Sequence, residues 1–399
     1  MWSRLPRLVS CFCLFCGLGL PLTGQYLRLF YPDIEQGSAT IVVAPNGTAM
    51  LVDAGPEKNP DDVLEHYVAS LMERGLITKL AYIVATHYDE DHIGRMDKLL
   101  GFLPLAPDTQ ILDRGEFGKV PKTFAYRDYK TAAAAFQRRT IAPGEILDLG
   151  DGVTVTCVAV NGMLIDGNRV DLSEASQFEN AASVALVVRF GAFDAFIGGD
   201  LLGNESFSLP PVEQRVAPAI GDVDIYTVNH HGSRTSSTEP FLAQLKPEVA
   251  ICQNAANNRH GHPNERIVRR IKTTANSFGE PPLFFQTNLS KLTDPRADYR
   301  LADGIADPDD GLAPRGRGGS IQVISDGAWY RVSAPLIEPV VRPCDGTTVG
   351  DGDPTGRERF PPAILDVFRD LYVPPSNRRT RILARVRFYR EALDRRAHV

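Results

Sequence analysis

Short apolar runs alternate with stretches of helical spacing along most of the chain, from residue 25 to about residue 333. The runs rich in β-branched and aromatic residues are predicted to be strands, and the stretches of helical spacing are predicted to be helices. Such an alternation indicates an α/β domain built in layers. The predicted strands are residues 26–31, 39–44, 49–52, 80–86, 154–160, 183–190, 195–197, 224–228, 249–252 and 320–325, and the predicted helices are residues 60–74, 95–100, 240–245 and 263–274.

The dipeptide Asn46-Gly47 lies between the predicted strands 39–44 and 49–52, with apolar residues on both sides. An Asn-Gly pair in this setting is the strongest short-range signal for a β-hairpin, because both residues readily adopt a positive φ. We therefore expect these two strands to be antiparallel neighbours.

The pattern changes beyond Ser333. Residues 335–362 are crowded with proline, glycine and aspartate, which predicts a linker. Residues 363–399 are predicted to be a basic helical tail with two helical segments, 363–371 and 377–396. The apolar residues of this tail favour a helix packed on the main domain, and its arginines leave docking to a membrane surface or to nucleic acid as the alternative.

The first 24 residues have the layout of a secretory signal peptide. Arg4 and Arg7 precede an apolar run over residues 8–20, and small residues lead to a cleavage position after Gly24. A single N-terminal membrane anchor is the alternative, although the run is shorter than the roughly 20 residues of a membrane span. We expect a secreted or periplasmic, extracytoplasmic protein with no stable membrane insertion after signal removal, since no later segment resembles a span.

The composition is that of a globular protein. With 399 residues, 43% of them hydrophobic and 23% charged, the chain can form one large domain and an extension, which excludes disorder as a whole. The net charge of −6 argues against a protein that coats nucleic acid through bulk charge. Outside the predicted signal peptide only Cys157, Cys252 and Cys344 remain, which is neither a disulfide framework nor a zinc knuckle.

Four candidate metal ligands lie within six residues, directly after the predicted strand 80–86. They are His87, Asp89, Asp91 and His92. Carboxylates and imidazoles packed this closely repel one another or lose hydration unless a divalent cation neutralises them and fixes their geometry. His87 and Asp89 can serve one metal while Asp91 and His92 point to a second. A charged loop without a metal is the alternative.

This motif is similar to the His-x-His-x-Asp-His signature of the metallo-β-lactamase superfamily, in the His-x-Asp-x-Asp-His form of the hydrolase domain of ComEC-type competence proteins. Further segments agree in order and spacing with that family over about residues 26–333. The resemblance implies a four-layer αββα metallo-β-lactamase-like sandwich over residues 25–334, with a C-terminal helical extension. The agreeing segments are Glu35-Gln36-Gly37-Ser38-Ala39, Leu51-Val52-Asp53-Ala54-Gly55, Gly198-Gly199-Asp200, His230-His231-Gly232-Ser233, Gly261-His262-Pro263 and the closing hairpin 318–332.

The resemblance implies further metal ligands. Asp200 ends a predicted apolar strand where the family has an aspartate that bridges both metals, although it could instead cap a loop. Asn180 stands where the family places another histidine, and no histidine lies between His92 and His230. An amide oxygen is a weak, hard ligand that favours manganese or magnesium over zinc. Asp53 would orient the motif loop from behind or form a turn.

One histidine of the pair His230-His231 should hold the second metal. Alternation along the predicted strand 224–228 places His231 with the polar Thr227 and Asn229, and a polar face suits a metal cleft. We therefore predict that His231 is the ligand and that His230 contacts or protonates the substrate. The reverse assignment stays open.

Residues that could bind the substrate lie near this pair. Ser233, Thr235 and Ser236 precede a predicted helix, where hydroxyls and free amides suit an anionic group or form an ordinary N-cap. His262 is expected at the rim of the site or simply at the surface. The predicted helix 263–274 carries a basic face that could steer a phosphate, or that is merely solvated; its residues are Arg266, Arg269, Arg270 and Lys272.

Together these features predict a secreted metal-dependent hydrolase with two divalent metal ions, zinc or manganese, and a hydroxide that both metals activate. His230, Asp91 and Asp200 are the predicted catalytic residues. The leading hypothesis is a nuclease or phosphodiesterase, which acts on a phosphodiester or small-molecule substrate and for which nucleic acid is one candidate. An ester, amide or lactam hydrolase and a catalytically silent binding module are the alternatives.

Overall fold

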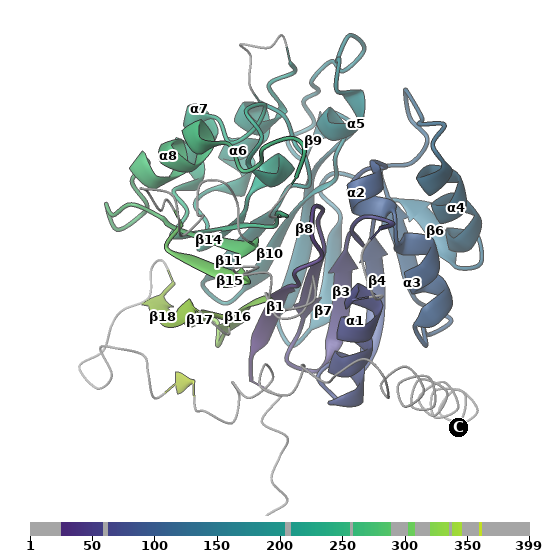
Figure 1. The fold of residues 1–399 in the computed structure, drawn as a ribbon, viewed down its shortest axis with the longest axis horizontal. Helices are drawn as coiled ribbons and strands as arrows, with labels where there is room; N and C mark the ends of the chain where they lie inside the picture. Colours follow the sequence, from purple (N-terminus) through teal and green to yellow (C-terminus); the bar gives the residue numbers. More distant parts are fainter. Residues whose placement is uncertain are drawn as a thin grey trace, which may run out of the picture.

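Two β-sheets pack face to face in the computed structural model, which describes residues 25–58, 63–203, 209–255, 258–288, 302–307, 320–334, 337–344 and 359–360. Helices cover both outer faces, with α1, α3 and α4 on one side and α6, α7 and α8 on the other (Figure 1). This is the four-layer αββα sandwich predicted from the sequence.

The first sheet is antiparallel from β18 to β3 and parallel from β3 to β6. Its spatial order is β18 (Ile337–Pro343), β17 (Trp329–Ala334), β16 (Ile321–Ser325), β1 (Leu27–Tyr31), β2 (Thr40–Val43), β3 (Thr48–Val52), β4 (Lys79–Val84), β5 (Gln110–Asp113) and β6 (Gln137–Thr140). The pair β2–β3 is the hairpin expected around Asn46-Gly47.

The second sheet is parallel from β15 to β11 and antiparallel from β11 to β7. Its spatial order is β15 (Gly304–Asp307), β14 (Leu283–Asn288), β13 (Val249–Cys252), β12 (Ile225–Thr227), β11 (Phe193–Ile197), β10 (Ala185–Phe190), β8 (Val153–Val160) and β7 (Ile146–Gly150), with β9 (Met163–Leu164) paired to β8.

The helices bury one apolar face each. On the first sheet lie α1 (Val63–Glu73), α3 (Met96–Phe102) and α4 (Phe124–Ala133), and on the second lie α6 (Val212–Ile220), α7 (Glu239–Leu245) and α8 (Glu265–Thr273). The short helices α2 (Glu90–Ile93) and α5 (Phe178–Ala181) lie in loops. A central core between the sheets and one core under each helix layer bury the strands on both faces, as continuous apolar runs require.

The structure differs in part from the domain boundaries that we predicted after residue 334. The linker expected over residues 335–362 is wrong in part, because Ile337–Pro343 forms β18 and pairs with β17. Phe360 is also buried, with its ring 5.8 Å from that of Tyr26. The predicted signal peptide, residues 1–24, and the predicted tail, residues 363–399, lie outside the described residues.

The structure also describes the three remaining cysteines and bears on the question of membrane spans. Cys157, Cys252 and Cys344 are all free and buried. No helix in the described part of the chain is both long and apolar enough to cross a membrane.

Candidate metal centre

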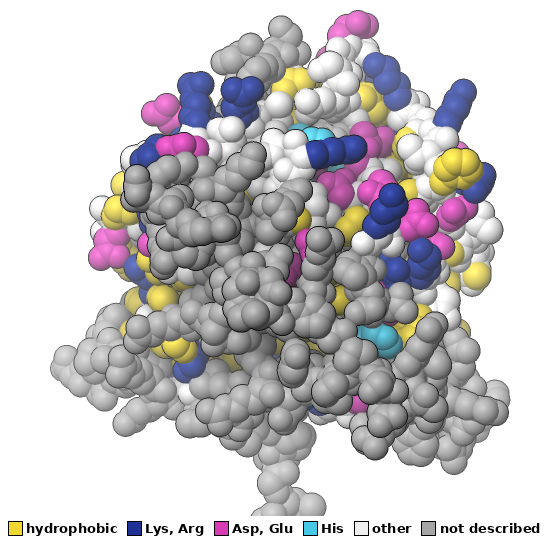
Figure 2. Space-filling view, in the orientation of Figure 1, with side chains coloured by type: hydrophobic (Ala, Val, Ile, Leu, Met, Phe, Trp, Pro, Cys, Tyr) yellow, Lys and Arg dark blue, Asp and Glu magenta, His cyan; other side chains and the backbone are white. Residues whose placement is uncertain are grey.

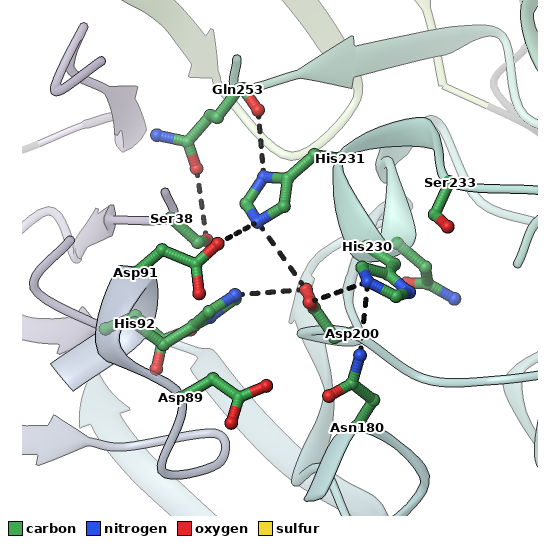
Figure 3. A network of polar contacts seen from close by, with 12 residues as sticks. Ser38, Asp89, Asp91, His92, Asn180, Asp200, His230, His231, Ser233 and Gln253 are labelled. Carbon is green, nitrogen blue, oxygen red and sulfur yellow. Dashed lines mark hydrogen bonds and ion pairs between the residues drawn. The ribbon is translucent and has the colours of Figure 1, made fainter. Parts of the chain in front are cut away.

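The predicted ligands gather where strands of the two sheets end. Asp53 follows β3 and the His87 motif follows β4, while Asp200 follows β11 and the histidine pair follows β12. Strands β3 and β4 are parallel, as are β11 and β12, so each pair of carboxyl ends meets at one edge of its sheet. Figure 3 shows the side chains from both edges pointing toward Asp200.

Asp53 holds the motif from behind. Its buried carboxylate accepts hydrogen bonds from the backbone nitrogen and the hydroxyl of Thr86, both at 2.8 Å. Nδ1 of His92 lies 2.7 Å from the same carboxylate, which leaves Nε2 free to face Asp200. Asp53 also has φ of 62°, so it forms the turn and orients the loop at once.

Two groups of side chains offer ligand atoms within 4.8 Å of one another: His87, His92 and Asp200, and Asp91, His92 and His231. Nε2 of His92 and Oδ1 of Asp200 are 3.0 Å apart. Nε2 of His87 and Nε2 of His231 are buried and form no hydrogen bond within the part of the chain that the structure describes. Leaving such an atom without a partner costs about 1–3 kcal/mol, so the donor set fits divalent cations.

The charges of the cluster also fit a cation. Burial and the neighbouring Asp200 raise the pKa of Asp89 to about 7, so its charge is disfavoured until a cation lies nearby. Burial and the neighbouring His92 lower the pKa of His87 well below its usual range, which keeps the ring neutral and able to ligate. Asp89 and His87 lie 3.7 Å apart, between Oδ2 and Nε2.

His231 turns its Nε2 toward the cluster. Its Nδ1 lies 2.9 Å from the backbone oxygen of Gln253, which leaves Nε2 to face the cluster, 3.5 Å from Asp91 and 3.7 Å from Asp200. The argument from strand alternation is wrong, however, because β12 ends at Thr227. Both histidines lie in a 3₁₀ turn, Asn229–Gly232, with left-handed φ values of 51° and 52°.

His230 is held in a different way. Its Nδ1 lies 2.9 Å from the hydroxyl of Thr235, and its Nε2 lies 3.1 Å from the amide nitrogen of Asn180 and 3.5 Å from Asp200. The amide nitrogen of Asn180 thus faces His230, and Figure 3 shows its oxygen turned to the side of Asp89. His230 also lines the cavity beside the cluster.

This cavity has a volume of about 540 Å³ and is lined by three loops as well as by the cluster. Ser233 and His262, two of the predicted substrate-binding residues, line it. Lys119 and His260 line it too and were not predicted. His260 could have been noticed because it stands two residues before His262, whereas nothing in the sequence around Lys119 marks it.

Two predicted substrate-binding residues have other partners. Ser236 is fully buried, and its hydroxyl donates to the backbone oxygens of Asn229 and Ser233, so it braces the turn and does not face the cavity. The hydroxyl of Thr235 lies against His230 and 3.0 Å from that of Ser233. Both hydroxyls are thus used within the protein, that of Ser236 by backbone oxygens and that of Thr235 by side chains.

A buried arginine and a glutamate join the loops around the site, and no local sequence pattern marks either of them. Arg114 donates to both carboxylate oxygens of Glu179 at 2.7 Å. It also donates to the backbone oxygens of Phe117 and Lys119. Glu179 in turn accepts from the backbone nitrogen of Tyr88, between His87 and Asp89, at 2.8 Å.

Glu213 of α6 braces the histidine turn from the other side. Its fully buried carboxylate accepts from the side-chain amide of Asn229 at 2.8 Å and from the backbone nitrogens of Ser237 and Thr238 at 2.7 and 3.0 Å. Each of its oxygens therefore has a partner. Because both oxygens accept hydrogen bonds from this segment, the Glu213 carboxylate holds the turn that carries both histidines in place.

Comparisons with known proteins agree with this fold. Residues 32–154 match the metallo-beta-lactamase superfamily. Recombination protein 2 of Haemophilus influenzae is 25% identical over 268 residues, which cover 64% of this chain and 29% of that protein. ComE operon protein 3 of Bacillus subtilis is 24% identical over 283 residues, which cover 64% of this chain and 33% of that protein.

The chain therefore spans only a minor part of the length of these two relatives. Among solved structures, the metallo-beta-lactamase fold protein YhfI of Bacillus subtilis is similar with a TM-score of 0.39 and 12% identity, over 64% of this chain and 95% of that one. The superfamily match over residues 32–154, the two-sheet fold and the sequence relatives show that the chain contains a metallo-β-lactamase superfamily domain and is similar in sequence to Recombination protein 2 and ComE operon protein 3.

Proposed function

We propose that this protein is a metal-dependent phosphodiesterase whose substrate is nucleic acid. The observation that carries the proposal is the cluster itself, in which buried imidazole nitrogens and carboxylates from two sheets converge beside a cavity of about 540 Å³. The superfamily is largely one of metal-dependent hydrolases, which supports hydrolysis as the reaction class.

The cavity supports an anionic substrate. Lys119, His260 and His262 line it together with the hydroxyl-bearing Ser233, and these groups can donate to phosphate oxygens. The names of the relatives, one a recombination protein, support nucleic acid as the source of the phosphodiester. Burial and the neighbouring His230 lower the pKa of His262 to about 3, so this ring donates as a neutral imidazole, while Lys119 supplies positive charge opposite the carboxylates Asp89 and Glu179 of the same cavity.

We assign the ligands as two sets that share Asp200. His87 and Asp89, with the amide oxygen of Asn180, would hold one divalent ion, and Asp91, His92 and His231 would hold the other. Zinc and manganese are the proposed ions. When bound, such ions act as Lewis acids at the phosphoryl group and lower the pKa of a water molecule.

The residues of the chain do the rest. Asp53 and Glu179 hold the motif loop, and Gln253 holds His231, so the ligand atoms need little rearrangement. His230 lines the cavity, Thr235 fixes its ring through Nδ1, and the amide nitrogen of Asn180 lies 3.1 Å from Nε2. A phosphodiester that takes the place of this amide contact would receive a proton on its leaving oxygen from Nε2 of a protonated His230.

The test compares metal-loaded and metal-free protein on bis(p-nitrophenyl) phosphate and on single-stranded DNA. We expect hydrolysis that needs manganese or zinc and that Asp91→Ala and Asp200→Ala abolish, because each removes a carboxylate from the cluster. Asp128→Ala, an exposed aspartate on α4, is the matched control and should keep full activity. Elemental analysis that finds no divalent metal after loading would contradict the proposal.

We also propose that the protein acts outside the cytoplasm. The proposal rests on the signal-peptide pattern of residues 1–24 alone. Mass spectrometry of the protein recovered from the periplasm or the medium should find a mature chain that begins at Gln25. A full-length chain retained in the cytoplasm would exclude it.

A further inference from the structure

A second hollow, which we call the α7–α8 groove, lies outside the metal centre. It has a volume of about 480 Å³ and is lined by Glu239 and Ala243 of α7 and by Arg266, Arg269, Arg270 and Thr273 of α8, among others. Figure 2 shows arginine and lysine side chains in dark blue over these two helices, with acidic side chains beside them. Neither the ligands nor the cavity of the metal centre use these residues.

The positive charge of this groove is only partly compensated. Arg269 forms an ion pair with Glu265 at 2.7 Å. The side chain of Arg266 is exposed and forms no hydrogen bond or ion pair with any residue that the structure describes. Arg270 donates one hydrogen bond, at 2.8 Å, to a backbone oxygen, which does not neutralise its charge.

Arg266 and Arg270 are four residues apart on one helix, so their side chains lie on the same face. Like charges in this arrangement destabilise a helix by a few tenths of a kcal/mol. Burial and the neighbouring Arg266 lower the pKa of Arg270, as expected for two cations that face the same hollow. A bound anion would relieve this repulsion.

Helix α8, which lines the groove, is also linked to residues near the metal centre through the chain and through a hydrogen bond. Helix α8 begins three residues after His262, which lines the cavity. The backbone oxygen that accepts from Arg270 belongs to Ser237, in the segment that follows the histidine pair. From Arg266 to Thr273 the helix rises about 10 Å, which is longer than the axial rise of about 3.4 Å per phosphate in one strand of a duplex.

We propose that the α7–α8 groove binds the phosphate backbone of an extended substrate strand whose scissile phosphodiester lies in the metal centre. This proposal rests on the proposed function and deepens it, because it gives the polymeric substrate a second binding region outside the metal centre. Arg266 and Arg270 contact the phosphates, while Glu239 of α7, which also lines the groove, offsets part of the charge of Arg270. Small phosphodiesters fill the cavity alone and do not reach the groove.

The experiment measures binding and turnover separately in the full chain. Binding of a short fluorescein-labelled single-stranded oligonucleotide is followed by anisotropy in EDTA, and turnover of bis(p-nitrophenyl) phosphate is followed with metal. We expect Arg266→Glu to raise Kd for the oligonucleotide roughly tenfold, since a charge-assisted contact is lost. The salt dependence of log Kd should fall by about one unit of slope. Turnover of the small substrate should not change.

Arg127→Glu on α4 is the matched control, because it makes the same change of charge on an exposed helix far from α8 (Figure 1). Arg266→Gln repeats the test without a reversal of charge. Equal oligonucleotide affinity in the Arg266 variants and the control would overturn the proposal, as would equal competition by poly-glutamate, which senses charge alone. No hydrolysis by the wild type, with binding that still depends on Arg266, would contradict only the proposed function.

Discussion

At the scale of single residues, the two histidines of the pair differ in which ring nitrogen the protein holds. In His231, Nδ1 lies within hydrogen-bond distance of the backbone oxygen of Gln253. Nε2 of this ring has no hydrogen-bond partner among the described residues. In His230 both nitrogens have partners, Thr235 and Asn180. A free, buried Nε2 suits a metal ligand, whereas a ring held at both ends suits contact with the substrate.

We therefore predict that His231→Ala loses metal from the second site together with activity. His230→Ala should keep its metal and lose roughly 10²–10⁴-fold in turnover, as the removal of a general acid does. Elemental analysis and kcat of the two purified variants measure this difference. The opposite metal contents would mean that the roles of the two histidines are exchanged.

The residues of the cluster could be found from the sequence because they stand at the ends of apolar strands or within one short motif. His87 to His92 is such a motif, and Asp200 ends β11. Arg114 and Glu179 could not be found in this way, since they are ordinary charged residues 65 positions apart. Their pairing depends on the folded arrangement of two loops, which no local pattern records.

At the scale of elements, that same ion pair joins three segments around the site. Arg114 follows β5, Glu179 lies in α5, and Tyr88 belongs to the metal motif after β4. Arg114 has no exposed surface, and its guanidinium lies 4.5 Å from the centre of the Tyr88 ring. A change in one segment must therefore affect the position of the other two.

We expect Glu179→Ala to weaken metal binding roughly 10–100-fold, because the backbone between His87 and Asp89 loses its acceptor and Arg114 is left as a buried, unpaired charge. Glu179→Gln, which keeps an acceptor for Tyr88, should weaken it less. A competition titration with a metal-chelating dye measures the affinity, and Glu174→Ala, an exposed glutamate in the preceding loop, is the control. Unchanged affinity in Glu179→Ala would show that the ion pair serves the fold alone.

Strands whose two faces are both buried could be predicted from the sequence. Strands such as β10 and β13 are apolar along their length and are found at or close to the predicted positions. The edge strand β6, Gln-Arg-Arg-Thr, is mostly exposed and carries no apolar signal. Helix α6 was not predicted, because Pro218 lies inside it and a proline is a signal against a helix interior. The turn Asn229–Gly232 was not predicted because its left-handed histidines break the extended pattern.

At the scale of the whole molecule, the sheet order depends on pairings between distant segments. β1 pairs with β16, and Tyr26 near the described start packs with Phe360 near the described end. Such contacts bury surface that neither segment could bury alone, and the sequence pattern does not name the partner. The domain therefore continues beyond residue 334, through β18 and Phe360.

The end of the folded domain can be tested by truncation. A variant that ends after Phe360 should unfold at the same temperature as the full chain and keep its activity on a small phosphodiester, because no described site residue is removed. A variant that ends after Ala334 loses β18, the buried Cys344 and the buried Phe360. Burial of one large apolar side chain contributes about 1.5–3 kcal/mol.

The shorter variant also leaves β17 as an exposed edge that can pair with other chains. We therefore expect its Tm to fall by several degrees and its solubility to drop, in comparison with the variant that ends after Phe360. Thermal unfolding followed by circular dichroism measures both variants under one condition. Equal Tm values would mean that β18 and Phe360 add nothing to the stability of the sandwich and that the domain closes at β17.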